Sequence, residues 1–487
     1  MRRILSSTAF LSGASFLGIL TGLITGKLSA LWLGPRGVGA LGEISSTIGL
    51  GGFVLGLGVS MSVTRVGSNF LAAEDEKSFT ALVWAARSSV AAMIAIGIAV
   101  TILWGQSISQ DLYGSSGYRV FILPFLLVSV LGNSFAGIES GILRARLKYI
   151  KALSGASVIY VLVTFALSVA GLATRHTGAM LPVYAGSALA NAVILASLVK
   201  KHQLVRLRRP PITQIIRGAR TMYGFGLPFT TSMLVGNGVR MVIPVLVLHW
   251  AGDRNLGFYM AAITISSQYL GFLSNSMLQD YAPQLSSEND PVNLEKLIMD
   301  ELTVVLLITT PLICLVMMLS PVVIPLVYTS KFTPAVPIIQ WMVAADLFRF
   351  GLWPISYAIL SKMPGKYYLS LESLGGALAL VVSWLGFRLG GLTGLGWAYV
   401  IIFPLLAAAT LAIGLRVLPL SWSSFPWKTI AASFLAITGM RVLSLWGLNP
   451  FPTIIMSLIA LASSLWSYKH LAQGWQMHAP ANLTLQE

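Results

Sequence analysis

Ionisable side chains inside long apolar stretches are the residues of this 487-residue sequence that could do chemistry. Arg240 lies near the centre of the stretch 222–250. Asp346 and Arg349 lie near the centre of another stretch, 335–361, one helical turn apart. Because a charge is costly in hydrocarbon, such residues usually pair or face a polar cavity. We interpret these three as cavity residues, with a buried structural ion pair as the alternative.

Lys27 is a further candidate cation, within a glycine-rich stretch that suits close helix packing. It lies near the outer end of its stretch, so its long side chain could also reach the interface. The deep charges are mostly basic, and a cationic cavity suits an anionic substrate such as a diphosphate. The candidate substrate-binding residues are therefore Lys27, Arg240 and Arg349.

Acidic residues in the apolar stretches could couple transport to an ion or have a structural role. We keep four of them as coupling or structural candidates: Asp346, Glu139, Glu43 and Glu372. Glu139 and Glu372, like Arg87 and Asp280, lie near the inner ends of their stretches, where a solvated interfacial role is favoured. Arg441, near the C-terminus, is also interpreted as interfacial.

No catalytic set accompanies these charges. The sequence contains no HExxH, CxxC or GxSxG pattern, and its one cysteine, Cys314, lies in an apolar run. The segment from Gly22 to Lys27 is a poor phosphate loop, because Leu28 replaces the required Ser or Thr. We predict a protein that is not an enzyme and has no cofactor or metal. H⁺ or Na⁺ coupling stays open.

The composition predicts a helical membrane protein. Apolar residues make up 56% of the chain, charged residues 10%, and the mean hydropathy is +0.79. The apolar runs last about 20 residues and do not alternate, which favours helices over barrel strands. We predict fourteen transmembrane helices at 8–33, 40–64, 80–104, 119–143, 152–173, 178–199, 222–250, 256–281, 302–328, 335–361, 368–388, 392–415, 427–447 and 451–471.

The positions of Lys and Arg predict the orientation. With both termini in the cytoplasm, most of the basic residues fall in cytoplasmic segments. The opposite side then holds only Arg36, Arg119, Arg175, Arg254, Lys331 and Arg388. Basic loops beside anionic lipid also explain the net charge of +16 without nucleic-acid binding.

Matching residues at nearly one offset indicate an internal repeat. One set is Gly34, Arg36 and Gly39 against Gly252, Arg254 and Gly257. The other set is 142–149 against 359–367. Chance similarity between glycine-rich turns is the alternative.

The repeat predicts an all-α polytopic membrane protein with two pseudo-symmetric six-helix lobes around a central cavity, plus two extra C-terminal helices. The predicted parts are an N-lobe at 1–199, a basic cytoplasmic linker at 200–221, a C-lobe at 222–416 and appended helices at 417–487.

Three groups of residues, in order along the chain, resemble the Wzx-type flippases of O-antigen and enterobacterial common antigen units. These flippases form the polysaccharide-transporter branch of the multidrug/oligosaccharidyl-lipid/polysaccharide exporter superfamily. The first group is Gly26, Lys27, Leu28, Gly34, Pro35 and Gly39. The second is Tyr281 and Pro283. The third is Ser330 to Thr333, Trp341, Asp346, Arg349, Tyr367 or Tyr368, and Glu372.

The resemblance covers about residues 5–416, and the last two helices depart from the family pattern. It implies a bacterial inner-membrane flippase in lipopolysaccharide and O-antigen biosynthesis. Its substrate would be an undecaprenyl-diphosphate-linked glycan, moved from the cytoplasmic to the periplasmic leaflet by alternating access. Membrane lipids, a polysaccharide polymerase and a chain-length regulator are the implied partners. Lys27 as a cavity cation, and Asp346 with Arg349, carry over from the family.

Other functions stay open. A cation-coupled drug antiporter of the same superfamily would favour acidic and aromatic cavity residues. A membrane glycosyltransferase or polymerase would need a sizeable outer loop with catalytic carboxylates or arginines, whereas the predicted outer loops, such as 174–177, are short. A scaffold without transport activity is the remaining class.

Overall fold

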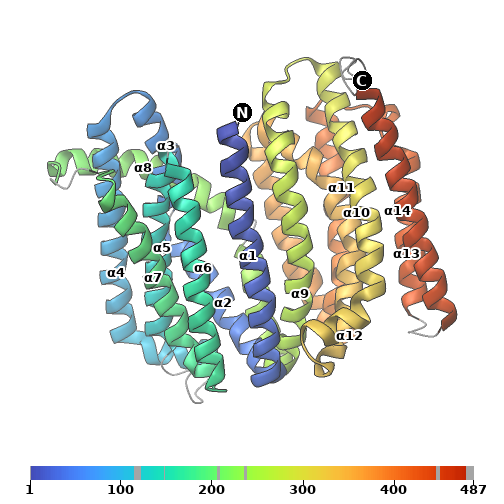
Figure 1. Ribbon diagram of the computed structural model, residues 1–487, viewed down its shortest axis with the longest axis horizontal. Helices are drawn as coiled ribbons and strands as arrows, with labels where there is room; N and C mark the ends of the chain where they lie inside the picture. The colour runs from blue at the N-terminus through green and yellow to red at the C-terminus, as the bar shows by residue number, and fades with distance from the viewer. Residues whose placement is uncertain are drawn as a thin grey trace. The chain divides into compact units, whose positions relative to one another are not determined.

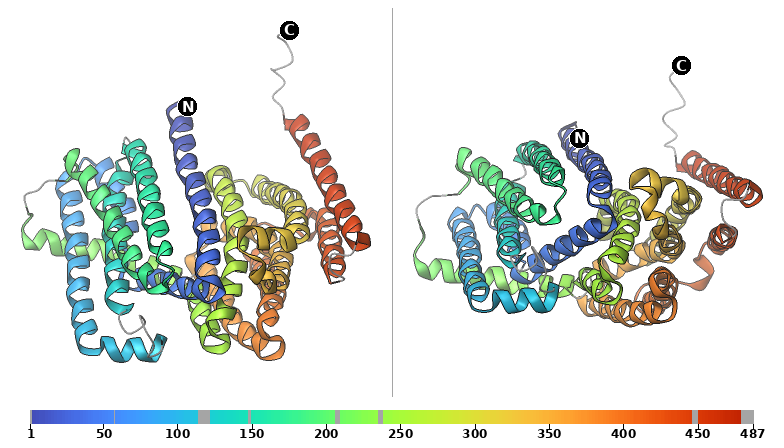
Figure 2. Two further views of the ribbon diagram at one scale, coloured as in Figure 1. Left: turned by 60° about the horizontal axis from the view of Figure 1, so that its bottom comes forward. Right: turned by 90° about the horizontal axis from the view of Figure 1, so that it is seen from below.

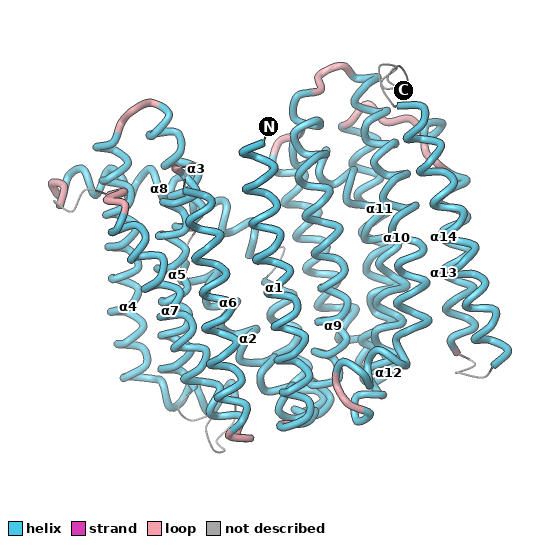
Figure 3. The backbone as a smooth tube through the Cα atoms, in the orientation of Figure 1, coloured by secondary structure: helices cyan, strands magenta, loops and turns pink. Residues whose placement is uncertain are grey.

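The computed structural model describes residues 2–56, 58–113, 122–146, 149–205, 209–234, 238–445 and 450–478. Within these ranges the regular elements are helices (Figures 1 and 3). The α-helices are α1 Arg2–Trp32, α2 Gly34–Gly56, α3 Val59–Ala72, α4 Glu76–Tyr113, α5 Ile122–Ala145, α6 Ile150–Ala173, α7 Met180–Lys201, α8 Ile212–Met233, α9 Val239–Ser287, α10 Pro291–Val327, α11 Val336–Lys362, α12 Gly365–Val417, α13 Trp427–Ser444 and α14 Pro450–His478. Three short 3₁₀ helices join them, η3 Thr177–Ala179, η5 Ser330–Ala335 and η6 Trp422–Ser424.

The prediction of an all-helical, multi-pass membrane protein is confirmed. In the described part of the chain, seven helical segments are long and apolar enough to cross a membrane. Helical hydrogen bonding pairs most of their backbone polar groups within each segment, which suits the bilayer core.

The structure divides two of the predicted stretches differently, and glycine explains one of the differences. The predicted helix 40–64 is broken at Gly58, which has a positive φ of 65° and separates α2 from α3. The predicted pair 368–388 and 392–415 corresponds to the two helical segments of α12, which meet at a kink at Gly391 with a φ of 56°. Only glycine adopts such backbone angles at little cost. The start of the predicted helix 222–250 instead belongs to the separate helix α8.

The chain forms two compact units, Met1–Gly257 and Phe258–Glu487, here called unit 1 and unit 2. In unit 1, α5 packs against α2, α3, α4 and α7. The core between these helices includes Phe79, Leu82, Ile138, Ile142 and Leu143, all fully buried.

Small residues let α5 approach its neighbours closely. A Cβ atom on Gly132 would lie 3.0 Å from the Ala188 backbone of α7, and one on Gly141 would lie 3.0 Å from the Ser60 carbonyl oxygen of α3. Ser60 in turn donates a hydrogen bond from Oγ to the Gly137 carbonyl at 2.8 Å. Such small-residue contacts stabilise helix pairs where lipid provides no hydrophobic drive.

Arg146, just beyond α5, connects the end of α5 to the start of α4 and to the segment after α7. Its Nη2 donates to Glu76 Oε2 at 2.6 Å, at the start of α4, and to the Leu204 carbonyl at 3.1 Å, beyond α7. Its guanidinium also lies 5.2 Å from the centre of the Phe79 ring. One side chain thus connects three segments that are distant in sequence.

The two copies of the repeated glycine motif contact each other within unit 1. Gly34 and Gly252 both have a positive φ, of 67° and 77°. A Cβ atom on Gly39 would collide with the Asp253 carbonyl oxygen, and one on Gly257 would collide with the Pro35 carbonyl oxygen. This reciprocal packing of equivalent positions supports the repeat inferred from sequence.

In unit 2, α11 packs against α10 and α12, while α13 and α14 pack against α10 (Figure 2). Thr310 Oγ1 of α10 donates a buried hydrogen bond to Ser433 Oγ of α13 at 2.7 Å. Glu295 Oε1 of α10 accepts hydrogen bonds from the Ser421 amide at 2.6 Å, from Ser421 Oγ at 2.8 Å and from Ser424 Oγ at 2.5 Å. The C-terminal helices are therefore fixed to α10 at two places.

Gly39→Ala tests the contact between the repeated motifs. We expect it to lower the free energy of unfolding by about 1–3 kcal/mol, because the added methyl group must displace backbone. Thermal unfolding of the detergent-purified protein measures the effect. Gly22→Ala is the matched control, since a Cβ there meets nothing within 4 Å. Equal unfolding temperatures for the two variants would show that the contact is unimportant.

Candidate functional site

Arg87 and Glu139 form an ion pair between α4 and α5, in which Arg87 is partly exposed. Arg87 donates from Nε to Glu139 Oε1 and from Nη2 to Glu139 Oε2, each at 2.9 Å. The Glu139 side chain is fully buried, and the Arg87 guanidinium lies 6.0 Å from the centre of the Phe135 ring. The interfacial, solvated interpretation of Glu139 does not fit this geometry.

A forked pair of this kind holds both carboxylate oxygens in fixed positions. Because the two residues lie on different helices, the pair cross-links α4 and α5. Removing one partner would leave the other without its counter-charge, which is costly. The geometry favours a structural role for Glu139 over proton transfer.

Asp346 and Arg349 occupy one face of α11, as their spacing indicated. Arg349 Nη1 lies 3.7 Å from Asp346 Oδ1, and the guanidinium lies 5.5 Å from the centre of the Phe403 ring of α12. Ser266 Oγ of α9 donates to Asp346 Oδ2 at 3.4 Å. The Asp346 carboxylate is thus a buried acceptor where α9 and α11 meet in unit 2.

The separation of 3.7 Å makes this a looser pair than the fork in unit 1, and Arg349 retains about a fifth of its side-chain exposure. Its Nε has no hydrogen-bond partner among the described residues. The guanidinium therefore keeps donor capacity that an anion could use.

The other candidates are distributed over several helices. Lys27, half-buried on α1, and Glu43, almost fully buried on α2, belong to unit 1. Glu372 is half-buried on α12 of unit 2. Arg240 begins α9, but its side chain lies outside the described residues, as does that of Asp280.

Three residues that carried the family resemblance support the packing of unit 2. Tyr281 donates from its hydroxyl to the Pro354 carbonyl at 2.9 Å, which joins α9 to α11. Phe332 is fully buried, stacked on Tyr328 at 4.9 Å and edge-on to Phe258 at 5.8 Å between ring centres. Trp341 receives a guanidinium on its face, as described next.

Arg441, interpreted from the sequence as an interfacial residue, is covered by a side chain of a neighbouring helix. It is buried in the last turn of α13, with Cζ only 3.9 Å from the centre of the Trp341 ring of α11. Its position near a helix end suggested an interfacial side chain. The contact with Trp341 could not be predicted from the sequence near Arg441, because Trp341 lies on another helix.

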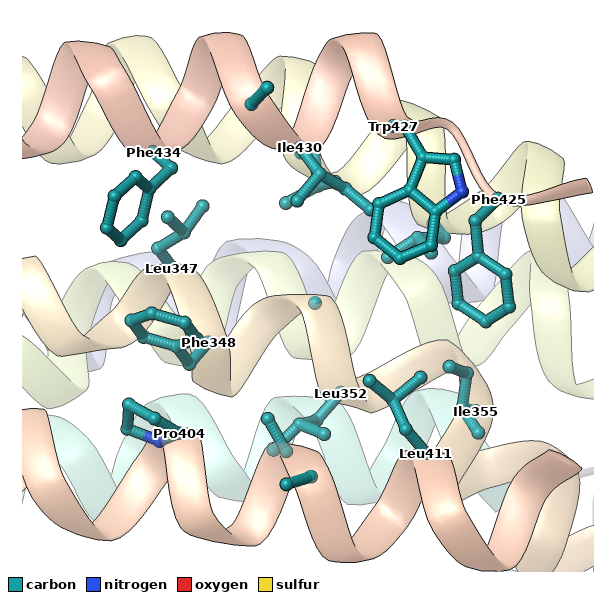
Figure 4. Close-up of a pocket in the computed structure, with 16 residues that line it drawn as sticks. Leu347, Phe348, Leu352, Ile355, Pro404, Leu411, Phe425, Trp427, Ile430 and Phe434 are labelled. Carbon is teal, nitrogen blue, oxygen red and sulfur yellow. The ribbon is translucent and has the colours of Figure 1, made fainter. Parts of the chain in front are cut away.

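Apolar cavities lie beside this arginine in unit 2. One, of about 420 Å³, is lined by Arg441, Trp341 and residues of α11, α12 and α13. Another, of about 500 Å³, continues along α13 (Figure 4). The labelled side chains of Phe348, Leu352 and Phe434 point into it from opposite sides.

The chain is similar in sequence to two curated flippases. The lipid III flippase of Escherichia coli (strain K12) is 22% identical over 371 residues, which is 74% of this chain and 86% of that protein. The lipid III flippase of Shigella flexneri matches to the same extent. These relatives are transporters rather than enzymes, in agreement with the prediction from sequence.

Solved structures show the same fold. The lipid II flippase MurJ in an inward closed conformation has a TM-score of 0.73 at 17% identity, covering 95% of this chain and 99% of that one. An inward-facing multidrug resistance MATE transporter of the MOP superfamily has a TM-score of 0.63 at 17% identity, with 82% and 94% covered.

A model of one protein family matches residues 33–337, well over half of the sequence. That stretch includes the glycine motifs and the Arg87–Glu139 pair, whereas Lys27, Asp346, Arg349 and Glu372 lie outside it. The chain belongs to this family, the polysaccharide biosynthesis proteins.

Proposed function

We propose that this protein is a flippase that moves undecaprenyl-diphosphate-linked oligosaccharide repeat units from the cytoplasmic to the periplasmic leaflet of the bacterial inner membrane. The observation that carries the proposal is the family match together with similarity to lipid III flippases over most of both chains. The MurJ-like fold supports it.

The physical task is to move a polar glycan and a diphosphate past hydrocarbon. A wet cavity can replace the lost hydration, and basic side chains offset the phosphate charge. We propose that the cavity opens to one leaflet at a time by alternating access of two lobes, 1–199 and 222–416, joined by the basic linker 200–221.

Lys27, Arg240 and Arg349 are the proposed contacts for the diphosphate. Arg349 supports this role best, because its guanidinium is only loosely paired with Asp346 and keeps an unused donor. Lys27 is half-buried on a glycine-rich helix, and its long, flexible side chain can move its ammonium group toward a charged ligand. Arg240 is proposed only because it lies near the centre of the apolar stretch 222–250.

Asp346 is the best proposed coupling acid. It is buried, and a serine hydroxyl on another helix contacts its carboxylate. Protonation of the Asp346 carboxylate would weaken its attraction for Arg349. The arginine would then be released to bind the substrate, so proton binding and substrate binding would be coupled. Glu43 and Glu372 stay proposals of lower rank, and Glu139 is proposed as a structural acid.

The proposed setting is a multi-pass inner-membrane protein with both termini in the cytoplasm. A polysaccharide polymerase and a chain-length regulator are the proposed partners downstream, and O-antigen is the proposed class of glycan.

A drug antiporter is the second candidate, favoured by the likeness to the MATE transporter. It would bind lipophilic cations. The basic candidates Lys27, Arg240 and Arg349 disfavour such substrates, because like charges repel in a low-dielectric cavity.

Lys27→Ala, Arg240→Ala and Arg349→Ala, made singly at native expression, test the binding role. Each should reduce surface glycan about tenfold, because one charge-assisted contact to the diphosphate is lost. Lipid-linked sugars should accumulate in the cytoplasmic leaflet. Quantified surface glycan and extracted lipid-linked sugars measure the two effects.

Arg388→Ala is the matched control, since Arg388 is exposed on α12 with its guanidinium 5.6 Å from the Trp384 ring centre. Normal glycan in all three test variants, with normal amounts of protein in the membrane, would refute the cationic site. Increased drug sensitivity with normal glycan would favour the antiporter.

Glu139→Gln separates structure from coupling. We expect a loss of about 1–3 kcal/mol in the free energy of unfolding, because the partly exposed Arg87 loses its charged hydrogen-bond partner. Replacing both residues, Arg87→Met with Glu139→Leu, should recover most of the stability. Thermal unfolding in detergent is the measurement, with Glu372→Gln as the control. A stable Glu139→Gln protein that no longer transports would instead identify Glu139 as a coupling acid.

A further inference from the structure

Arg441 is a buried cation that has no carboxylate partner in the part of the chain that the structure describes. Only 7% of the residue is exposed, and its guanidinium lies over the Trp341 ring, with Cζ 3.9 Å from the ring centre. It donates from Nη1 to Ser444 Oγ at 2.6 Å, a neutral acceptor on its own helix. Among the described residues, Nε has no hydrogen-bond partner and no carboxylate lies within ion-pair distance.

The positive charge of Arg441 is therefore not balanced by an anion among the described residues. Burying an arginine without an anion is costly, and stacking on an aromatic ring offsets only part of that cost. A phosphate group fits the remaining donors, because the guanidinium fork binds phosphate oxygens in pairs.

The space beside the guanidinium has the shape and chemistry for an aliphatic chain. The cavity of about 420 Å³ at Arg441 shares Leu347, Phe348, Pro404 and Phe434 with the cavity of about 500 Å³ along α13 (Figure 4). The two cavities are therefore adjacent, and together they are here called the α13 groove. Apart from Arg441 and Thr438, its walls are hydrocarbon or aromatic side chains.

The α13 groove is open on its side. Phe434, Val442 and Leu445 line it and are also 48%, 50% and 62% exposed. α13 packs against α10 and α11, which belong to segments long and apolar enough to cross a membrane, so we expect this exposed apolar surface to face lipid. The groove runs from Arg441 to Trp427, about 21 Å along the helix, which exceeds the roughly 15 Å depth of one leaflet of hydrocarbon.

We propose that the α13 groove is a binding site for an anionic membrane phospholipid, with its phosphate on Arg441 and one acyl chain along α13. Charge selects this occupant. A neutral hydrocarbon chain would fill the groove but leave the guanidinium without an anion, whereas an anionic phospholipid satisfies both parts. The site is distinct from the diphosphate contacts proposed above, so it does not depend on the flippase proposal.

Lipid retention tests the site. The protein is reconstituted in nanodiscs of phosphatidylglycerol and phosphatidylcholine, extracted with mild detergent and analysed by native mass spectrometry. The wild type should retain one phosphatidylglycerol in preference to phosphatidylcholine. Arg441→Gln should retain about tenfold less, because the charge-assisted contact is lost. Arg441→Lys should keep part of the preference.

Arg388→Gln is the matched control, because Arg388 also lies over a tryptophan ring but is exposed. It should retain lipid like the wild type. Equal retention by Arg441→Gln and the wild type would overturn the proposal.

Ala344→Trp tests the groove without changing charge. Ala344 lines the cavity at Arg441, so the indole should displace the acyl chain and lower retention as Arg441→Gln does. A phosphatidylglycerol carrying a photoreactive acyl chain should label α11, α12 or α13 in the wild type and not in Ala344→Trp. Labelling confined to other helices would overturn the proposal.

Discussion

The cost of holding a charge in hydrocarbon is the constraint on which the rest of this structure depends. Three arginines in or beside the apolar helices meet it differently. Arg87 is neutralised by a forked contact with Glu139, and it cross-links two helices. Arg349 is held loosely by Asp346, at 3.7 Å. Arg441 rests on an aromatic ring. The completeness of each pairing separates structural charges from those with capacity left for a ligand.

Glycine provides the second physical theme, because helices that must satisfy every backbone group internally can change direction only at special residues. The bends at Gly252 and Gly391 occur at left-handed backbone angles. The close approach of Gly39 to the Asp253 carbonyl joins the two copies of the repeated motif. The same residue type therefore sets both the bends and the tightest helix contact in unit 1.

The sequence predicted the features that depend on local pattern. Apolar runs predicted the helices, and the spacing of Asp346 and Arg349 predicted that they share a face. Their pairing was left open, because spacing does not determine rotamers. The partnership of Arg87 with Glu139 was not predicted, since these residues are 52 positions apart and meet only through the packing of α4 on α5.

The burial of Arg441 could not be predicted from its position along its helix. Its place in the last turn of α13 indicated the interface, but Trp341 of α11 covers it. Burial of a long cationic side chain depends on its tertiary neighbours, and apolar periodicity does not encode them.

The central claim is that this protein moves a lipid-linked glycan across a bilayer, and a reconstituted flipping assay tests it most directly. Proteoliposomes would contain an undecaprenyl-diphosphate-linked fluorescent sugar, and a membrane-impermeant reductant would quench the outward-facing molecules. We predict that wild-type protein makes nearly all of the fluorophore accessible with time, whereas protein-free liposomes stay protected at about half. Equal protection with and without the protein, under an imposed H⁺ or Na⁺ gradient as well as in its absence, would contradict the claim.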